Sequence, residues 1–238
     1  MGVKPVEKLS EKRVLLFGLG GVGGAALEAM VRAGIGAFDL VDDDCFTFSN
    51  LNRQILSKRE LVGTPKVDAA EQRIREINPG CRVRKYKMFY LPETRGALNF
   101  KDYDYIVDCI DTVKAKIDII LRATEAGVPV ISAMGCGNRF DPSKLTVTDI
   151  YKTENDRLAK AVRRELRKQG VSSLPVVYST EPAYRPHYEE VYGSGENKLE
   201  EEYAGKRLPP GSTPFVPNAA GILLASVVAR ELSGFSRD

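Results

Sequence analysis

Residues 18–24 read Gly18-Leu19-Gly20-Gly21-Val22-Gly23-Gly24, and they directly follow the apolar run Val14-Leu15-Leu16-Phe17. Three aspartates, Asp42-Asp43-Asp44, come about 20 residues further along. A buried strand that turns on glycines into a helix leaves backbone N–H groups unpaired, and these groups face an anion together with the positive end of the helix. The stretch therefore predicts a phosphate-binding turn between a strand and a helix.

The residues of this stretch have separate expected roles. Gly18 and Gly20 permit a tight turn and a close approach of the backbone to a phosphate, and Gly23 lets the helix pack near the strand. Asp42 is expected to accept hydrogen bonds from ribose hydroxyls. Together they predict a nucleotide site, although the glycine pattern alone does not choose the nucleotide.

Strand-like apolar runs alternate with helical patterns along the chain. This order predicts right-handed βαβ units and an α/β fold: a Rossmann-like mixed sheet with helices on both faces. We expect one domain over residues 1–238, with a parallel nucleotide-binding half at 1–135 and a more antiparallel substrate and dimerisation half at 136–238. The expected strands are 13–17, 38–41, 83–89, 105–109, 130–133 and 145–150, and the expected helices are 23–33, 65–77, 114–126, 156–169 and 219–229.

The composition is that of a globular protein with one core. The chain has 238 residues, 43% of them hydrophobic, and a net charge of +3. The mild positive charge suits an anionic partner such as RNA, or it serves solubility alone. The four cysteines form no CxxC pair, which excludes a structural zinc site of that spacing; they are Cys45, Cys81, Cys109 and Cys136.

The termini predict a cytoplasmic protein without a membrane span. Residues 1–9 lack the apolar core of a signal peptide. The apolar stretch 219–229 is shorter than the roughly 20 residues that cross a bilayer, so a buried helix is the expectation there. Residues 182–214 are rich in proline and glycine and are predicted to form a long crossover loop, either a lid ordered by substrate or an excursion with no role.

Two basic residues are candidates for one polyphosphate. Arg53 lies in the segment Ser49-Asn50-Leu51-Asn52-Arg53-Gln54, and Lys66 lies in the first turn of the predicted helix 65–77. An arginine offers a planar fork for phosphate oxygens and a lysine offers a compact charge. Each alone is an ordinary surface charge. Together with the glycine turn they favour ATP over a dinucleotide, because hydride transfer needs no such phosphate clamp.

Asp111 is the candidate metal ligand. It falls just past the end of the predicted strand 105–109, where ligands collect in open α/β sheets. One carboxylate, phosphate oxygens and waters are a usual set of ligands for Mg²⁺, which neutralises a leaving pyrophosphate. Asp108 lies within the strand itself, and a purely structural, hydrogen-bonded role for it stays open.

These motifs, in this order, resemble the ATP site of the ubiquitin-activating-enzyme-like adenylating superfamily (ThiF-MoeB-HesA), in which ATP adenylates a carboxylate. The resemblance implies that Asp42 holds the ribose, that Asn50, Arg53 and Lys66 hold the phosphates, and that Asp111 holds Mg²⁺ or the attacking carboxylate. With Arg53, Lys66 and Asp111 as the catalytic residues, the further candidate nucleotide-binding residues are Gly18, Gly20, Gly21, Gly23, Asp44, Gln54 and Thr112.

A narrower resemblance comes from residues 132–143 and 147–150, and it continues at Lys152-Thr153, 215–217 and 220–221. These stretches are similar to the tRNA threonylcarbamoyladenosine dehydratase family. The resemblance implies a cytoplasmic homodimer that uses ATP to activate the threonyl carboxylate of N6-threonylcarbamoyladenosine in tRNA and closes it into a ring with loss of water. It leaves open a monovalent cation and a sulfur-relay partner, for which the sequence identifies no site.

Two other functions stay open. The first is adenylation of the C-terminal carboxylate of a ubiquitin-like sulfur-carrier protein, and the second is a non-catalytic ATP-binding scaffold. No cysteine follows Cys136, so thioester or persulfide transfer from the 182–214 loop is excluded. Cys136 itself is expected to be a packing residue rather than a nucleophile.

Residues 156–169 predict an amphipathic basic helix, in which Leu158, Val162 and Leu166 recur at four-residue spacing. Such a face can bind tRNA phosphates with little sequence preference, or it is an ordinary solvated helix. The candidate tRNA-binding residues are Arg157, Lys160, Arg163, Arg164, Arg167 and Lys168.

The chain departs from the family pattern in two places. Members of the family carry an N-terminal segment with an arginine that reaches the ATP of the neighbouring subunit, and Arg13, which lies in a predicted strand, is a poor substitute. The family commonly has a proline where this chain has Arg157, after Asn155-Asp156. We expect the second departure to affect only the local loop geometry.

Overall fold

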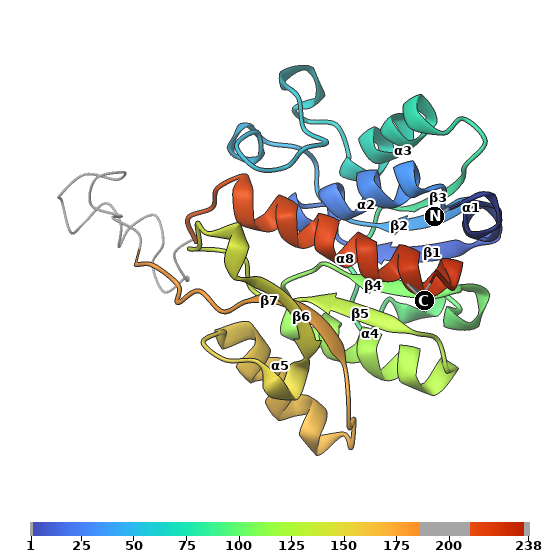
Figure 1. The fold of residues 1–238 in the computed structure, drawn as a ribbon. Coiled ribbons are helices and arrows are strands. Elements are labelled where there is room, and N and C mark those ends of the chain that lie inside the picture. Colours follow the sequence, from blue (N-terminus) through green and yellow to red (C-terminus); the bar gives the residue numbers. More distant parts are fainter. Residues whose placement is uncertain (1, 186–209, 236–238) are drawn as a thin grey trace.

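The computed structural model describes residues 2–185 and 210–235 (Figure 1). Short 3₁₀ turns connect several of its elements. In chain order the helices and strands are α1 (Val3–Glu11), β1 (Arg13–Phe17), α2 (Gly21–Ala33), β2 (Ala37–Val41), α3 (Lys66–Ile77), β3 (Arg82–Tyr86), β4 (Tyr105–Asp108), α4 (Val113–Ala126), β5 (Val130–Ala133), β6 (Leu145–Asp149), α5 (Arg157–Lys168), β7 (Pro175–Ser179) and α8 (Phe215–Ser233).

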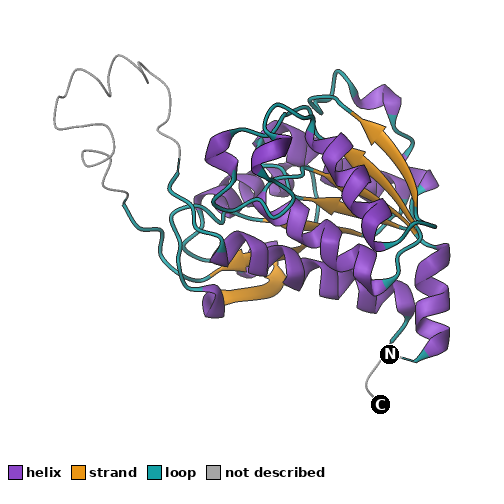
Figure 2. Cartoon of the chain, turned by 90° about the horizontal axis from the view of Figure 1, so that it is seen from above, coloured by secondary structure: helices purple, strands orange, loops and turns teal. Residues whose placement is uncertain are grey.

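The strands of the described residues form one sheet in the order β3-β2-β1-β4-β5-β7-β6. All neighbouring strands are parallel except β6, which pairs antiparallel with β7. Helices lie on both faces of the sheet (Figure 2). The predicted fold class is therefore confirmed, and the antiparallel character of the C-terminal half comes from a single strand at the edge.

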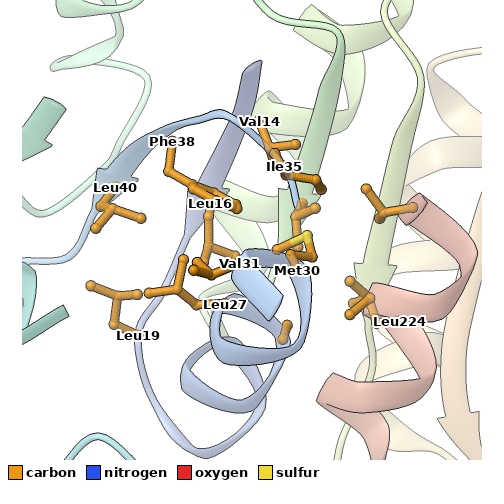
Figure 3. Close-up of a cluster of buried hydrophobic side chains, with 14 of the residues drawn as sticks. Val14, Leu16, Leu19, Leu27, Met30, Val31, Ile35, Phe38, Leu40 and Leu224 are labelled. Carbon is orange, nitrogen blue, oxygen red and sulfur yellow. The ribbon is translucent and has the colours of Figure 1, made fainter. Parts of the chain in front are cut away.

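Alternate side chains of strand β1 are buried on the two opposite faces of the sheet. Val14 and Leu16 point toward α2 and α8, where Leu27, Met30 and Leu224 complete a buried cluster (Figure 3). The alternate residues of β1, Leu15 and Phe17, belong to a second buried cluster with β4 and α4. A parallel strand covered on both faces is apolar throughout, which is why this run lacks the alternation of a half-exposed strand.

The C-terminal half shares the core of the N-terminal half. Ile120 of α4 packs with Val162 and Leu166 of α5 and with Val176 of β7. The apolar stripe predicted for residues 156–169 is thus the buried face of α5. The sheet runs continuously through both halves, while the boundary at 135 and 136 stays a prediction.

The sequence prediction missed two elements. Helix α1 precedes β1, and its Leu9 is fully buried against the core. Strand β7, at residues 175–179, begins with Pro175, and a proline weakens the prediction of a strand. It becomes a strand through its pairing with β5 on one side and β6 on the other.

Helix α8 is longer than the expected 219–229. By length and composition alone α8 could cross a membrane, so the argument that the stretch 219–229 is too short to span a bilayer was wrong. Half of the apolar window of α8 is buried inside the protein. It packs lengthwise against α2 (Figure 1). Most of the predicted crossover loop 182–214 lies outside the described residues.

We predict that Leu224→Ala lowers the free energy of unfolding by about 2–5 kcal/mol, because it leaves a cavity between α8, α2 and β1. Leu224 is fully buried. Urea unfolding followed by circular dichroism measures the effect. The control is Ser226→Ala on the exposed side of the same helix, for which we expect a change below about 0.5 kcal/mol; equal effects would contradict the role given to the α2–α8 contact.

Candidate functional site

A pocket of about 460 Å³ opens at the carboxyl ends of β1 and β4. The strand order reverses between these two strands: β2 and β3 continue on one side, and β5 and β7 on the other. Such a switch point is where ligands bind in open α/β sheets. Its lining comes from segments far apart in the sequence: Phe17, Gly18, 20–22, 41–44, Arg53, Gln54, Lys66, 88–90, 109–112, Cys136, Gly137, Pro210, Ser212 and Pro217.

The glycine turn has the geometry that the sequence predicted. Gly18 has a φ of +85°, a conformation that side chains disfavour. A Cβ on Gly23 would overlap the carbonyl oxygen of Gly18, so only glycine lets α2 start this close to β1. Helix α2 begins at Gly21 directly after this turn, with its first N–H groups at the pocket. The turn is thus built to receive an anion.

Lys66 and two aspartates form a charged cluster on the β2 side of the pocket. Lys66 Nζ is 2.7 Å from Asp44 Oδ2 and 3.9 Å from Asp42 Oδ1. The Asp42 carboxylate accepts hydrogen bonds from the backbone N–H groups of Leu19 and Asp44. Burial raises the pKa of Asp42, and the charge of Lys66 opposes that rise. Asp42 therefore joins the end of β2 to the glycine turn, in addition to any contact with a ligand.

Arg53 and Gln54 approach the pocket from the 3₁₀ segment after β2. Arg53 Nη1 donates to the Ser49 carbonyl and to Asn52 Oδ1. Burial lowers the pKa of Arg53, although an arginine still stays charged at neutral pH. Gln54 is only 6% exposed, and its Oε1 has no hydrogen-bond partner among the described residues. It is an acceptor available to a donor in the pocket.

Asn50 is one of two predicted nucleotide-binding residues that do not line the pocket. Its Oδ1 accepts a hydrogen bond from the backbone N–H of Thr47 and caps a 3₁₀ turn. All the other candidates except Gly23 line the pocket directly, and Gly23 acts through the close packing described above. Asn50 therefore stabilises the conformation of the segment that carries Arg53 to the pocket.

Asp111 and Thr112 line the pocket from the turn between β4 and α4, and Asp111 is exposed. No group of three or more potential metal ligands occurs in the described part of the chain. The donor set at this turn fits a magnesium ion that is shared with a bound polyphosphate, because Mg²⁺ commonly takes one or two carboxylates and keeps phosphate oxygens and waters as its other ligands.

The sequence does not predict one wall of the pocket. Met88, Phe89 and Tyr90 come from the connection after β3 and give the pocket an apolar side. Tyr90 donates to Asp118 Oδ2 at 2.7 Å and accepts from Arg122 at 2.9 Å, both on α4. These residues carry no local motif, and only the fold brings them to the pocket.

The two cysteines of the pocket are poor nucleophiles. Burial raises the pKa of Cys136 to about 12, and it also raises the pKa of Cys109. Both thiols are therefore protonated at neutral pH, and the thiolate that attacks an adenylate is not formed. This agrees with the expected packing role of Cys136.

The basic residues of α5 are not equivalent. Arg163 donates to the carbonyls of Ile150 and Thr153 and is used in holding the fold. Arg164 and Lys168 flank Glu165 at 3.0 Å, and Arg167 lies over the Tyr151 ring. Arg157 and Lys160 are exposed and make no ion pair with any described residue.

The start of α5 is tied to the pocket. Asp156 caps the helix by accepting from the Ala159 N–H, and it also accepts from the N–H of Gly135, next to Cys136 of the pocket wall. Arg139, 5% exposed, pairs with Asp156 at 3.3 Å. The cap forms with Arg157 in the first helical position, where the family commonly has proline.

Comparisons with known proteins agree with this geometry. Residues 1–188 match the ThiF family. The chain is 38% identical over 237 residues to the tRNA threonylcarbamoyladenosine dehydratase of Bacillus subtilis, covering 98% of this chain and 91% of the relative. It is 35% identical over 193 residues to the dehydratase of Escherichia coli, covering 78% of this chain and 72% of that relative.

Solved structures give the same result. The fold superposes on the E. coli dehydratase in complex with ATP with a TM-score of 0.82 at 29% identity, covering 98% of this chain and 90% of the other. E. coli MccB with ATP shares the fold only, at a TM-score of 0.62 and 20% identity, covering 98% and 59%. The chain therefore belongs to the ThiF family, and the Bacillus subtilis relative, which it covers to 91%, is a tRNA threonylcarbamoyladenosine dehydratase.

Proposed function

We propose that this protein catalyses the ATP-dependent dehydration of N6-threonylcarbamoyladenosine in tRNA through an adenylated carboxylate. The observation that carries the proposal is the pocket, which brings the glycine turn, Arg53, Lys66 and Asp111 together from distant segments. The similarity to dehydratases of nearly the same length supports the substrate. A tRNA substrate also favours the cytoplasm as the location.

The positions of the lining residues favour one orientation of ATP in the pocket. The phosphates meet the N–H groups of the glycine turn and the start of α2, with Arg53 and Lys66 beside them, and the ribose lies at Asp42. The apolar wall of Met88 and Phe89 is suited to the adenine ring. Lys66 already contacts Asp44, so a bound phosphate competes with that carboxylate for the lysine.

The reaction has two steps. An oxygen of the threonyl carboxylate attacks the α-phosphorus of ATP, and the bond to pyrophosphate breaks. A nucleophilic atom of the carbamoyl group then attacks the activated carbonyl, closes the ring and expels AMP. The two steps together convert ATP into AMP and pyrophosphate and remove one water from the nucleoside. Arg53 and Lys66 stabilise the charge that develops on the phosphates.

Asp111 and Thr112 are the residues that would hold Mg²⁺ at this site. When bound, the metal neutralises charge on the departing pyrophosphate. A monovalent cation and a sulfur-relay partner stay open, because no described cluster of side chains points to either.

The direct test of the function uses tRNA that carries threonylcarbamoyladenosine. The protein is incubated with this tRNA, ATP and Mg²⁺, and the digested nucleosides are examined by mass spectrometry. We expect a nucleoside lighter by one water. If instead a ubiquitin-like carrier is adenylated and the tRNA is unchanged, the protein is a carrier-activating enzyme; if ATP binds and neither substrate yields AMP, it is a scaffold.

We predict that Asp111→Asn lowers the rate of AMP formation on the order of 100-fold, because a neutral amide cannot replace the carboxylate beside the polyphosphate. Circular dichroism should show an intact fold, since Asp111 is exposed. Asp102→Asn, also exposed and outside the pocket lining, is the matched control. Undiminished turnover in Asp111→Asn would remove this residue from the catalytic set.

For tRNA binding we favour Arg157 and Lys160 over the four other basic residues of α5. We predict that Arg157→Ala/Lys160→Ala weakens tRNA binding and lowers the slope of log Kd against log salt by about one per lost phosphate contact. The matched control is Arg164→Ala/Lys168→Ala, which removes two charges already paired with Glu165. Filter binding over a salt series measures both, and equal effects would mean that only net charge matters.

A homodimer is supported by an exposed apolar face around the start of α8. Phe140 and Phe215 are 59% and 49% exposed with ring centroids 5.2 Å apart, and Ile222 on α8 is 57% exposed. Such a face is typical of an interface between protein chains. We predict that Ile222→Glu shifts the mass measured by light scattering from dimer toward monomer. Val6→Glu, at 43% exposure on α1, serves as the control and should leave the mass unchanged.

A further inference from the structure

A charged side chain lies completely buried beneath the pocket. Lys116 of α4 is 0% exposed, and its Nζ donates to Asp108 Oδ2 at 2.8 Å, Ser132 Oγ at 2.9 Å and the Ala133 carbonyl at 2.8 Å. Three acceptors satisfy all three N–H groups of the ammonium. Ser132 in turn donates to Asp108 Oδ2 at 2.5 Å. We call Lys116, Asp108 and Ser132 the buried triad.

The buried triad is a costly way to fill this part of the core. Its neighbours in the sheet and in α4 are apolar, among them Ile106, Ala115 and Ile119. Apolar side chains of similar volume can often replace a buried ion pair without loss of stability, because removing two charges from water is expensive. Stability alone therefore gives no reason for a lysine at this position.

The buried triad holds both ends of the turn that carries Asp111. At the start of the turn, Asp108 Oδ1 accepts from the Ile110 N–H at 3.3 Å. At its end, the Lys116 side chain reaches from the first turn of α4 back to Asp108, at 2.8 Å, and so ties the start of the helix to the end of β4. The third contact of the ammonium, at Ala133, fixes the end of β5, which leads into Cys136 and Gly137 of the pocket wall.

We propose that Lys116 is a positioning residue, which together with Asp108 and Ser132 fixes the turn between β4 and α4 so that the Asp111 carboxylate faces the polyphosphate. This inference rests on the proposed function in so far as Asp111 acts on Mg²⁺ and ATP. The expected consequence is a pocket already arranged for the metal-bound nucleotide before substrate arrives.

The test removes the charge pair without leaving an unpaired charge. In Lys116→Met/Asp108→Leu we expect a Tm close to that of the unchanged protein and an unchanged affinity for ATP in the presence of EDTA. Calorimetry measures ATP affinity at increasing Mg²⁺ concentrations. We expect the Mg²⁺ concentration that gives half of the gain in ATP affinity to rise about ten-fold. A purely structural role would leave this concentration unchanged, and that result would overturn the proposal.

A second set of variants ties the effect to Asp111. In an Asp111→Asn background, the same double substitution should cause no further change in the Mg²⁺ dependence, because coupled residues are not additive. If the double variant does not fold, Ser132→Ala takes its place; it keeps the charge pair and should raise the half-saturating Mg²⁺ concentration several-fold. Additive effects in the Asp111→Asn background would contradict the proposal with either variant.

Lys114→Met is the matched control. Lys114 lies on the same helix but is exposed and pairs with Glu93 at 2.5 Å, so the Mg²⁺ dependence should not change. Because the readout is ATP binding without tRNA, it is independent of the reaction that follows. Failure to dehydrate the nucleoside would count against the proposed function, whereas an unchanged Mg²⁺ dependence would count against Lys116.

Discussion

Strands β1 and β4 pair in parallel at the centre of the sheet, and the helices that follow them pack on opposite faces, α2 with α8 and α4 with α5. The turns that leave the two strands therefore separate at the carboxyl edge of the sheet, and the pocket lies between them. Every functional feature depends on this separation. The β1 turn supplies the N–H groups for an anion, and the β4 turn supplies the carboxylate of Asp111.

Two lysines at the pocket are paired with carboxylates in the structure. Lys66 contacts Asp44 and is near Asp42, and the Lys116 ammonium is matched by Asp108. The two lysines differ in what they can do, because Lys66 lines the pocket while Lys116 is sealed beneath it. A phosphate can compete for the first lysine, whereas the second can act only by holding the backbone around it.

The candidate site was largely predictable, because its residues lie in turns with a local signature. A strand followed by glycines predicts the phosphate turn, and Asp111 is a candidate because it comes just after a strand-like apolar run. The sequence leaves the role of Asp108 open, and the structure shows it as a buried partner of Lys116. The six basic residues of α5 looked alike in the sequence, but the structure uses Arg163 internally and pairs two others with Glu165.

The sequence by itself determined the α/β class, the glycine turn and the buried and solvent-facing sides of α5, since each depends on residues only a few positions apart. Only the tertiary structure decided the course of β7, the apolar wall of Met88 to Tyr90, and the burial of Lys116. These features depend on contacts between segments distant in the chain: Lys116 meets Ser132 sixteen residues away, and β7 is a strand because β5 and β6 pair with it. Local sequence patterns predict helices, strands and turns, whereas contacts between distant residues are set by tertiary packing.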